Sequence, residues 1–371
     1  METIKLPFYA RLALILLALA LVCSILKAAS GIFIPLTFGL LIGILLFPLN
    51  KFFENKLRLG RTISPILCIL LFVSALVGFV YFLAVQVIGF SGDFPRLRTR
   101  FVQMTDGVQH WLHYKLHINN AQQTEYLNRS MNEIMGSMAQ SISNLFVSIT
   151  GVLLLTIFVL IFTFFMLYYR KLLMKFALVL FSAEHQPKVQ EVILETKRMI
   201  YSYVFGLVIE MAILSIVNCT MLLLMGVQYA LLLGVTAAVL NIIPYLGIYT
   251  SIIICMLVTL ANSTGNLALE AGFGLFIVHL LDSNILFPRI VGGRVKMNPF
   301  ITILAVITGE FLWGIPGMFL FIPITGIIKL ICERVEGMEA WGLLIGVEEL
   351  EKKPRLKLSL NRGGARVKKT E

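Results

Sequence analysis

The sequence predicts an all-α, polytopic helical membrane protein with about six spanning helices and two re-entrant or broken helical hairpins, which makes eight membrane segments, plus a small helical insert outside the membrane. The 371-residue chain is 58% hydrophobic and 14% charged, with a mean hydropathy of +0.89. Soluble domains are about 45–50% apolar and about 25% charged. Uncharged stretches long enough to cross a bilayer as a helix, about 20 residues, recur at 28–50, 62–92, 134–169 and 211–269.

The charge of +11 indicates orientation in a membrane and not a nucleic-acid partner. Its basic residues cluster at segment ends and in the tail, as the positive-inside rule expects. The start of the chain, with Lys5 and Arg11 before an apolar stretch, resembles a signal peptide, but spanning segments follow at once and favour a first transmembrane helix. The cysteines stand singly in apolar segments without metal or redox spacing, which is typical of small core residues; they are Cys23, Cys68, Cys219, Cys255 and Cys332.

The chain divides into an N-terminal membrane part, an insert, a transport core and a tail. Residues 1–89 are expected to form three transmembrane helices, joined by the basic, cytoplasmic connection Lys51–Arg61. Residues 144–198 are expected to hold a fourth transmembrane helix and a cytoplasmic linker. Residues 333–371 are expected to form a basic cytoplasmic tail, with eight Lys/Arg against two Glu between Leu350 and Glu371.

The insert, residues 90–143, is polar with a helical apolar period, which predicts amphipathic helices outside the membrane. Asp106, His110, His113 and His117 share one helical face, and imidazoles with a carboxylate on one stripe form a weak candidate zinc site. The spacing of the apolar residues gives the competing interpretation, in which the histidines lie on the solvent-exposed face of the helix.

Two topologies fit the transport core, residues 199–332. If 229–262 is one spanning helix, the basic loop RIVGGRVK, with Arg289, Arg294 and Lys296, lies outside and violates the positive-inside rule. If 229–262 is a hairpin that enters and leaves on the outer face, that loop is cytoplasmic and 299–331 forms a second hairpin from inside. The core then contains two inverted units, each a helix followed by a hairpin, and we favour this arrangement.

Both predicted hairpins are interrupted by proline and glycine, at NIIPYLG (Asn241–Gly247) and at GIPG (Gly314–Gly317). Proline removes a backbone donor and glycine permits close approach. In lipid such a break is tolerated only where protein or a water-filled cavity covers it, and paired breaks of this kind indicate a transporter's binding site. Two ordinary proline-kinked helices are the alternative. The hinge or break residues are Pro244, Gly247, Pro288, Gly314, Pro316 and Gly317.

Three acidic residues lie inside these segments, and two of them, Glu210 and Glu310, are the candidate proton or cation sites, with Asn241 and Asn284 as uncharged hydrogen-bonding groups. Glu210, Asp282 and Glu310 lie in apolar surroundings, where a charge is costly and faces a cavity or a partner. For Glu210 and Glu310, hydrogen bonding to Asn218, Asn241 or freed backbone groups is the structural alternative. Asp282 fits equally well at a cytoplasmic interface beside Arg289. The predicted substrate or ion path comprises Glu210, Asn241, Pro244, Gly247, Asp282, Asn284 and Glu310.

The sequence contains no Walker motif, phosphate-binding glycine loop or nucleophile triad. The one glycine cluster, at Gly292–Gly293, lacks the lysine and hydroxyl that would cradle a nucleotide. We therefore expect neither an enzyme nor a cofactor, and no transport powered by ATP within this chain.

Three motifs in order, NIIPYLG, LDSNILFPRIVGGRVKMNP and GEFLWGIPGMFLFIP, followed by WGLLIG, resemble the AI-2E family of bacterial membrane proteins. The resemblance runs to about Gly346 and is strongest over 200–346. Asp282, Asn284 and Pro288 match a family motif that usually begins with Glu, whereas Glu310 stands where many members carry a small residue. The family is named for proposed export of the autoinducer-2 signal, some members are linked to sodium(lithium)/proton antiport, and homo-oligomers are reported.

Taken together, residues and resemblance predict an exporter of a small polar solute or signal in the bacterial inner membrane, with both termini cytoplasmic and with proton or sodium coupling as an option. A sodium(lithium)/proton antiporter, an oligomeric passive channel and a non-transporting membrane scaffold are the alternatives. The expected partners are the lipid bilayer, the small-molecule or ion substrate and, by resemblance, further copies of the chain.

Overall fold

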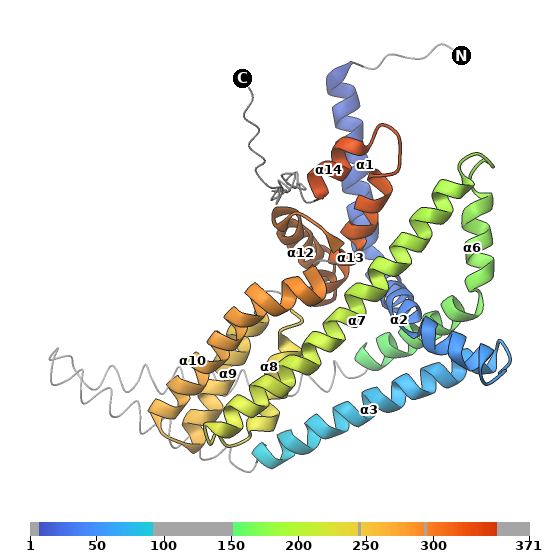
Figure 1. Cartoon of the computed structure of the whole chain (residues 1–371). Helices are drawn as coiled ribbons and strands as arrows, with labels where there is room; N and C mark the ends of the chain where they lie inside the picture. The colour runs from blue at the N-terminus through green and yellow to red at the C-terminus, as the bar shows by residue number, and fades with distance from the viewer. Residues whose placement is uncertain (1–6, 92–150, 244–245, 293–294, 347–371) are drawn as a thin grey trace, which may run out of the picture.

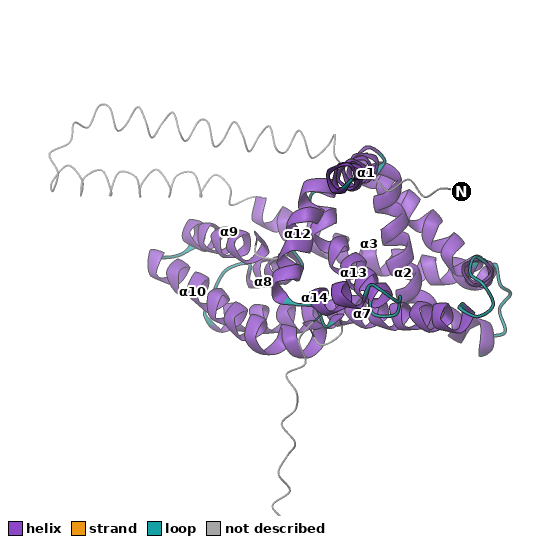
Figure 2. Ribbon diagram, turned by 90° about the horizontal axis from the view of Figure 1, so that it is seen from above, coloured by secondary structure: helices purple, strands orange, loops and turns teal. Residues whose placement is uncertain are grey.

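The computed structural model describes residues 7–91, 151–243, 246–292 and 295–346, and this part of the chain is helical apart from one isolated bridge between Met297 and Gly346 (Figures 1 and 2). Seven of its helices are long and apolar enough to cross a membrane, and three shorter apolar helices accompany them. The expected polytopic helical fold is confirmed. The seventh helix of spanning length belongs to the second predicted hairpin, which explains the difference from the expected six.

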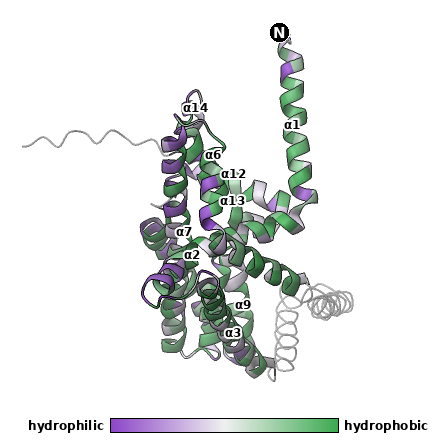
Figure 3. Ribbon diagram, turned by 90° about the vertical axis from the view of Figure 1, so that its right-hand side faces the viewer, coloured by the Kyte–Doolittle hydropathy of each residue, from purple (hydrophilic) through white to green (hydrophobic). Residues whose placement is uncertain are grey.

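The N-terminal helices are α1 (Phe8–Ala28), α2 (Ser30–Asn55) and α3 (Ile63–Ser91). None of the residues of α1 is buried, and most of this apolar helix projects away from the other helices, which it contacts at its C-terminal end (Figure 3). An exposed apolar helix of spanning length is expected where lipid replaces water as the solvent. The next described helix, Gly151–Tyr168, is followed directly by α6 (Arg170–Val179).

Helix α7 (Gln186–Leu224) differs from the sequence-based expectation of a separate linker and a helix starting near residue 199. It is one helix of 39 residues, because Pro187 stands in its first turn, where proline is tolerated, and no later proline interrupts it. Its charged N-terminal half is paired with the chain beyond α13: Arg334 contacts Glu191 and Glu195, at 3.1 and 2.8 Å, and Lys188 contacts Glu336 at 2.9 Å.

The segment predicted as the first hairpin consists of α8 (Ala230–Leu240) and α9 (Leu246–Asn262), which fold back on each other between α7 and α10 (Figure 1). Their buried side chains form one cluster with those of α7 and α10, including Leu222, Ala237 and Leu275. Gly247 is required at the turn, since a Cβ there would lie 1.8 Å from the carbonyl oxygen of Leu240. The structure therefore contains two short helices here and not one spanning helix.

Helix α10 (Gly265–Leu281) runs opposite to α7 and continues through two π-helical turns, η1 (Asp282–Leu286) and η2 (Pro288–Gly292) (Figure 1). The second hairpin follows, with α12 (Pro299–Trp313) packed along α13 (Ile315–Cys332). Gly314 joins them at φ +65° and ψ −146°, a conformation open to glycine. The short helix α14 (Glu339–Ile345) packs on α13.

The largest core cluster joins α2, the first half of α7, η2 and the second hairpin, with Ile200, Val291 and Leu320 almost fully buried. A second cluster surrounds α8, and the two together hold α7 between the hairpins. Seen from above, α9 and α10 lie at one end of the molecule and the α2–α3 connection at the other (Figure 2), and α3 runs back from there to contact α8. The region where α7 and α10 meet both hairpins lies between these ends.

Candidate functional site

A cavity of about 290 Å³ lies where α7, α8, α9, the end of α10, α12 and α13 meet. Most of its wall is apolar, as in typical small-molecule sites. Its polar wall groups include Glu210 on α7, Asn241 after α8, His279 and Asp282 at the end of α10, and Thr302 on α12. Residues far apart in the sequence therefore converge on one cavity.

Two carboxyl groups face each other in this cavity. Glu210 and Asp282 are each 4% exposed and lie within interaction distance of one another. The Asn241 side-chain amide donates a hydrogen bond of 2.9 Å to Asp282 Oδ2. The first chain break thus places an amide donor directly on one of the two buried acids.

Several buried polar atoms around the carboxyl pair have no hydrogen-bond partner. They are Glu210 Oε2, Asp282 Oδ1, Asn218 Oδ1 and His279 Nδ1. Buried polar groups are rarely left unpaired, so these atoms favour an occupant such as a solute, an ion or water, or a proton shared between the two carboxyl groups. Three of these four atoms are oxygens, which favours a proton, a small cation or a solute rich in donors.

The π-helical turn η1 begins at Asp282, where the amide of Phe287 donates to the Asp282 carbonyl. Pro288 has no amide hydrogen, so a regular α-helical ladder could not continue through it. Single π-turns inside α-helices are frequent at functional sites. Here the change of helical geometry coincides with the position of the cavity carboxyl group.

The structure brings part of the predicted path together. Glu210, Asn241 and Asp282 line the cavity. Asn284 is exposed and donates to the Leu280 carbonyl at 2.7 Å, and Glu310 is exposed on α12. Neither of these two residues lines the cavity.

The remaining predicted positions have other surroundings. Gly247 is buried in the helix contact of the first hairpin, and Pro288 and Arg289 are exposed at η2. Pro244 and Arg294 lie outside the described residues. So does the predicted zinc stripe of Asp106, His110, His113 and His117, and among the residues that are described no three His, Cys, Asp or Glu side chains are placed to hold a metal ion.

The second break packs against the N-terminal helices and not into the cavity. The indole N–H of Trp313 donates to the Leu26 carbonyl at 2.9 Å, and Phe319 stacks on Phe38 with ring centroids 5.9 Å apart. The second hairpin instead contributes Thr302, Val306 and Ile322 to the cavity wall. The body of this hairpin forms part of the site, while its Gly314–Gly317 turn does not.

Sequence reasoning missed several polar wall residues, among them His279 and Tyr203. His279 stands three positions before Asp282 and Tyr203 seven positions before Glu210, so each pair lies on one helical face. An isolated histidine in an apolar segment, spaced in this way from an acid, was the available signal. Asn218 was considered only as a partner of the acids, and its oxygen lines a small extension of the same region.

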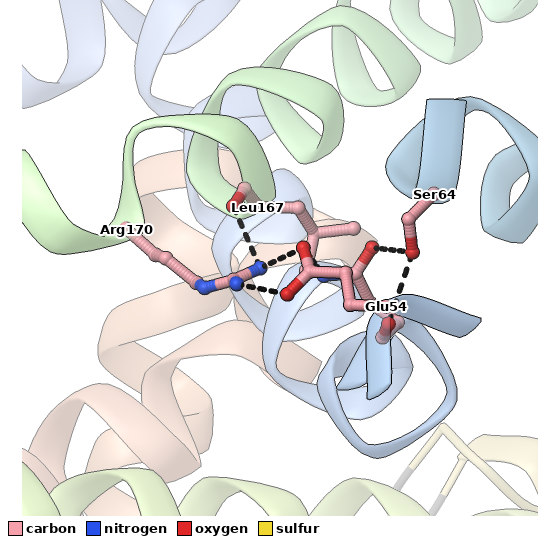
Figure 4. Close-up of polar contacts among 5 residues, drawn as sticks. Glu54, Ser64, Leu167 and Arg170 are labelled. Atoms are coloured by element: carbon pink, nitrogen blue, oxygen red, sulfur yellow. Dashed lines mark hydrogen bonds and ion pairs between the residues drawn. The ribbon is translucent and has the colours of Figure 1, made fainter. Parts of the chain in front are cut away.

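A separate polar cluster joins α2, α3 and α6 (Figure 4). Arg170 forms two hydrogen bonds with the Glu54 carboxylate, one of them 2.9 Å from Nη1 to Oε1. Asn50 donates to the same oxygen at 3.1 Å and accepts from the Ser64 hydroxyl at 2.8 Å. This cluster links the ends of three helices. Its residues are distant in sequence from those that line the cavity.

A family model described as AI-2E family transporter matches residues 13–337 of this chain. The chain belongs to the AI-2E transporter family. The match covers every residue that lines the cavity, so the carboxyl pair lies within the part of the chain that matches the family. Family membership also makes this a multi-pass membrane protein of a bacterial transporter family.

Individual relatives agree with this assignment. The AI-2E chain is 26% identical to the "Putative transport protein YrrI" of Bacillus subtilis, over 81% of its own length and 85% of the relative's. It is also 26% identical to YueF of the same organism, over 81% and 83%. A shorter match, 30% over 133 residues, covers 36% of this chain and 39% of the "AI-2 transport protein TqsA" of Escherichia coli.

Proposed function

We propose that this AI-2E family member moves a small polar solute across the bacterial inner membrane through the cavity between α7, α10 and the two hairpins. The observation that carries the proposal is the buried pair Glu210 and Asp282 in the cavity wall, each with one oxygen, Oε2 and Oδ1, that has no hydrogen-bond partner. An isolated buried charge is costly, so such acids in membrane proteins mark substrate, ion or proton pathways.

The pair also supports ion coupling. Two carboxylates in contact repel each other when both are ionised, so the site favours binding of at least one proton or small cation. A solute with hydrogen-bond donors is the second ligand that the free oxygens favour. Proton- or sodium-coupled export is therefore the main proposal, and sodium(lithium)/proton antiport, in which ions are the only cargo, is the second.

The orientation follows from charge and belongs to the same proposal. Basic residues occupy the α2–α3 connection, the start of α6 and the region after η2, and we infer that these are cytoplasmic together with both termini. The first hairpin then enters from the outer side, with its tip at the cavity. An assembly of several copies is proposed from the family resemblance alone.

The experiment measures flux in proteoliposomes containing purified protein, against a panel of small polar solutes and with imposed proton or sodium gradients. We expect Glu210→Gln and Asp282→Asn each to reduce flux by at least tenfold and to flatten its dependence on pH or sodium. Glu270→Gln, an exposed acid on α10, is the matched control and should retain wild-type flux.

Each alternative predicts a different result. Ion exchange without solute movement supports the antiporter. Single-channel currents that need no coupled gradient support a passive channel. If both cavity variants keep wild-type flux and pH dependence, the carboxyl pair is structural and the proposal is wrong. Absence of any flux, combined with loss of a cellular phenotype on deletion of residues 90–143, supports a scaffold.

A further inference from the structure

Two basic side chains lie over one phenylalanine of α2, where α2 meets the start of α6 and the N-terminal half of α7, and a third basic residue is close by on α2. Lys197 Nζ lies 2.9 Å and Arg170 Cζ 5.7 Å from the centroid of the Phe47 ring. Lys51 follows Phe47 by one helical turn, and both Lys51 and Arg170 are near enough to Lys197 to repel its charge. Like charges placed this close are unfavourable unless an anion offsets them.

The acidic residue in this cluster, Glu54, already has hydrogen-bond partners. Glu54 receives two hydrogen bonds from Arg170 and one from Asn50 (Figure 4), and Arg61 also acts on its charge. Within the described ranges, no carboxylate lies within ion-pair distance of Lys197, although its side chain is partly buried against α2. The cluster therefore keeps positive charge that no described side chain neutralises.

The adjoining helix α6 has the features of a helix that lies at a membrane surface. Leu172, Phe176 and Val179 share one face at helical spacing and are 60, 64 and 68% exposed. Lys171 and Lys175 are exposed beside that face. A short helix with an exposed apolar face and flanking lysines binds at the boundary between lipid headgroups and acyl chains. This observation, independent of the charge cluster, places lipid headgroups next to Arg170.

We propose that Lys51, Arg170 and Lys197 form a binding site for the headgroup phosphate of an anionic phospholipid in the inner leaflet. The negative charge of the phosphate offsets the positive charges of the basic side chains near Phe47, while the acyl chains lie along the exposed apolar face of α6. Basic pockets between transmembrane helices on the cytoplasmic side bind anionic headgroups in this way. The site does not depend on the cavity or on transport, but its placement in the inner leaflet rests on the orientation given under the proposed function.

The test is a lipid titration of the full-length protein in detergent, read by native mass spectrometry, with phosphatidylglycerol or phosphatidylcholine. The wild type should bind phosphatidylglycerol in preference to phosphatidylcholine. Lys197→Gln should weaken phosphatidylglycerol binding about fivefold, the contribution of one basic residue near an anionic surface. Lys51→Gln, at an exposed position where folding is not at risk, should weaken it to a similar degree.

Lys188→Gln is the matched control. It removes the same charge from the same helix, at an exposed position paired with Glu336, and should leave phosphatidylglycerol affinity unchanged. Because the basic tail is present in every variant, it cancels from the comparison. Equal binding of the two lipids, or equal losses in Lys188→Gln and Lys197→Gln, overturns the proposal. Displacement of phosphatidylglycerol by an equal concentration of inorganic phosphate assigns the site to a soluble anion and also overturns it.

Discussion

At the scale of single residues, the side chain of Asn241 determines how Asp282 is presented to the cavity. Its amide donates to Oδ2 at 2.9 Å and leaves the buried Oδ1 without a partner. A hydrogen bond to a charged group stabilises by about 1.5–3 kcal/mol. Asn241 therefore both stabilises a buried acid and leaves one of its oxygens available for a ligand.

Replacing Asn241 with leucine, which is similar in volume, removes this hydrogen bond. We expect Asn241→Leu to lower the free energy of unfolding by about 1–3 kcal/mol, because a buried carboxyl loses its partner, and to reduce flux to the level of Asp282→Asn. Thermal unfolding in detergent and proteoliposome flux measure the two effects. Asn266→Leu, at an exposed position on α10, is the control, and an equal effect there would contradict the assigned role of Asn241.

Glu310 is a single residue for which the sequence-based prediction and the structure differ. Its exposed carboxyl lies on α12 outside the cavity wall. We expect Glu310→Gln to change flux less than Glu210→Gln in the same proteoliposome assay. A larger loss for the Glu310 variant would place the ion site on α12 and contradict the carboxyl pair.

At the scale of elements, the second hairpin depends on direct backbone contact between its two helices. A Cβ at Gly309 would lie 2.2 Å from the Gly317 carbonyl oxygen, and one at Gly317 would lie 1.9 Å from that of Gly309. Such distances leave no room for a side chain. The glycines therefore set the spacing of α12 and α13, and with it the positions of Thr302 and Ile322 in the cavity wall.

Gly317→Ala should consequently force the two helices apart. Overpacking of a close contact costs about 1–3 kcal/mol, so we expect a lower thermal unfolding temperature and impaired flux. The control is Gly78→Ala in α3, where nothing lies within 4 Å of the added methyl group. In a helix interior alanine is favoured over glycine by up to about 1 kcal/mol. A Gly317→Ala protein that is as stable as the Gly78→Ala protein would contradict the close contact.

At the scale of the whole molecule, the opposed directions of α7 and α10 place the first hairpin's open end and the basic loop after η2 on opposite sides (Figure 1). The hairpin contributes two helices that enter and leave at the same end. With the basic connections inside, the α9–α10 connection is therefore expected outside.

Cysteine labelling in intact cells tests this orientation. In a background without the five native cysteines, Asn266→Cys should react with a membrane-impermeant maleimide added outside. Lys56→Cys and Arg289→Cys should react only after the cells are opened. All three positions are exposed in the structure, so packing against the protein does not explain a failure to react. Labelling of Arg289→Cys from outside would reverse the proposed topology.

The sequence by itself determined the class of the protein and its broken segments. Uncharged runs of spanning length have one stable outcome in lipid, the helix, because its backbone groups are satisfied internally. The clusters of proline and glycine at 241–247 and 314–317 fixed where the helices stop, because these residues act on the local backbone alone. The acids Glu210 and Asp282 were identifiable in the same way, since a charged residue in an apolar membrane segment is costly and usually faces a cavity or a partner.

Only the tertiary structure decided which of these residues form one site. Glu210, Asn241 and Asp282 meet because α10 runs back along α7 with the first hairpin between them, and this contact depends on packing between distant segments. Glu310 and the Gly314–Gly317 turn had equal sequence signals, yet packing leaves Glu310 exposed and turns the glycine break toward α1 and α2. His279 and Tyr203 joined the site for the same reason: spacing along a helix gives a shared face, but only the neighbouring helices determine what that face meets.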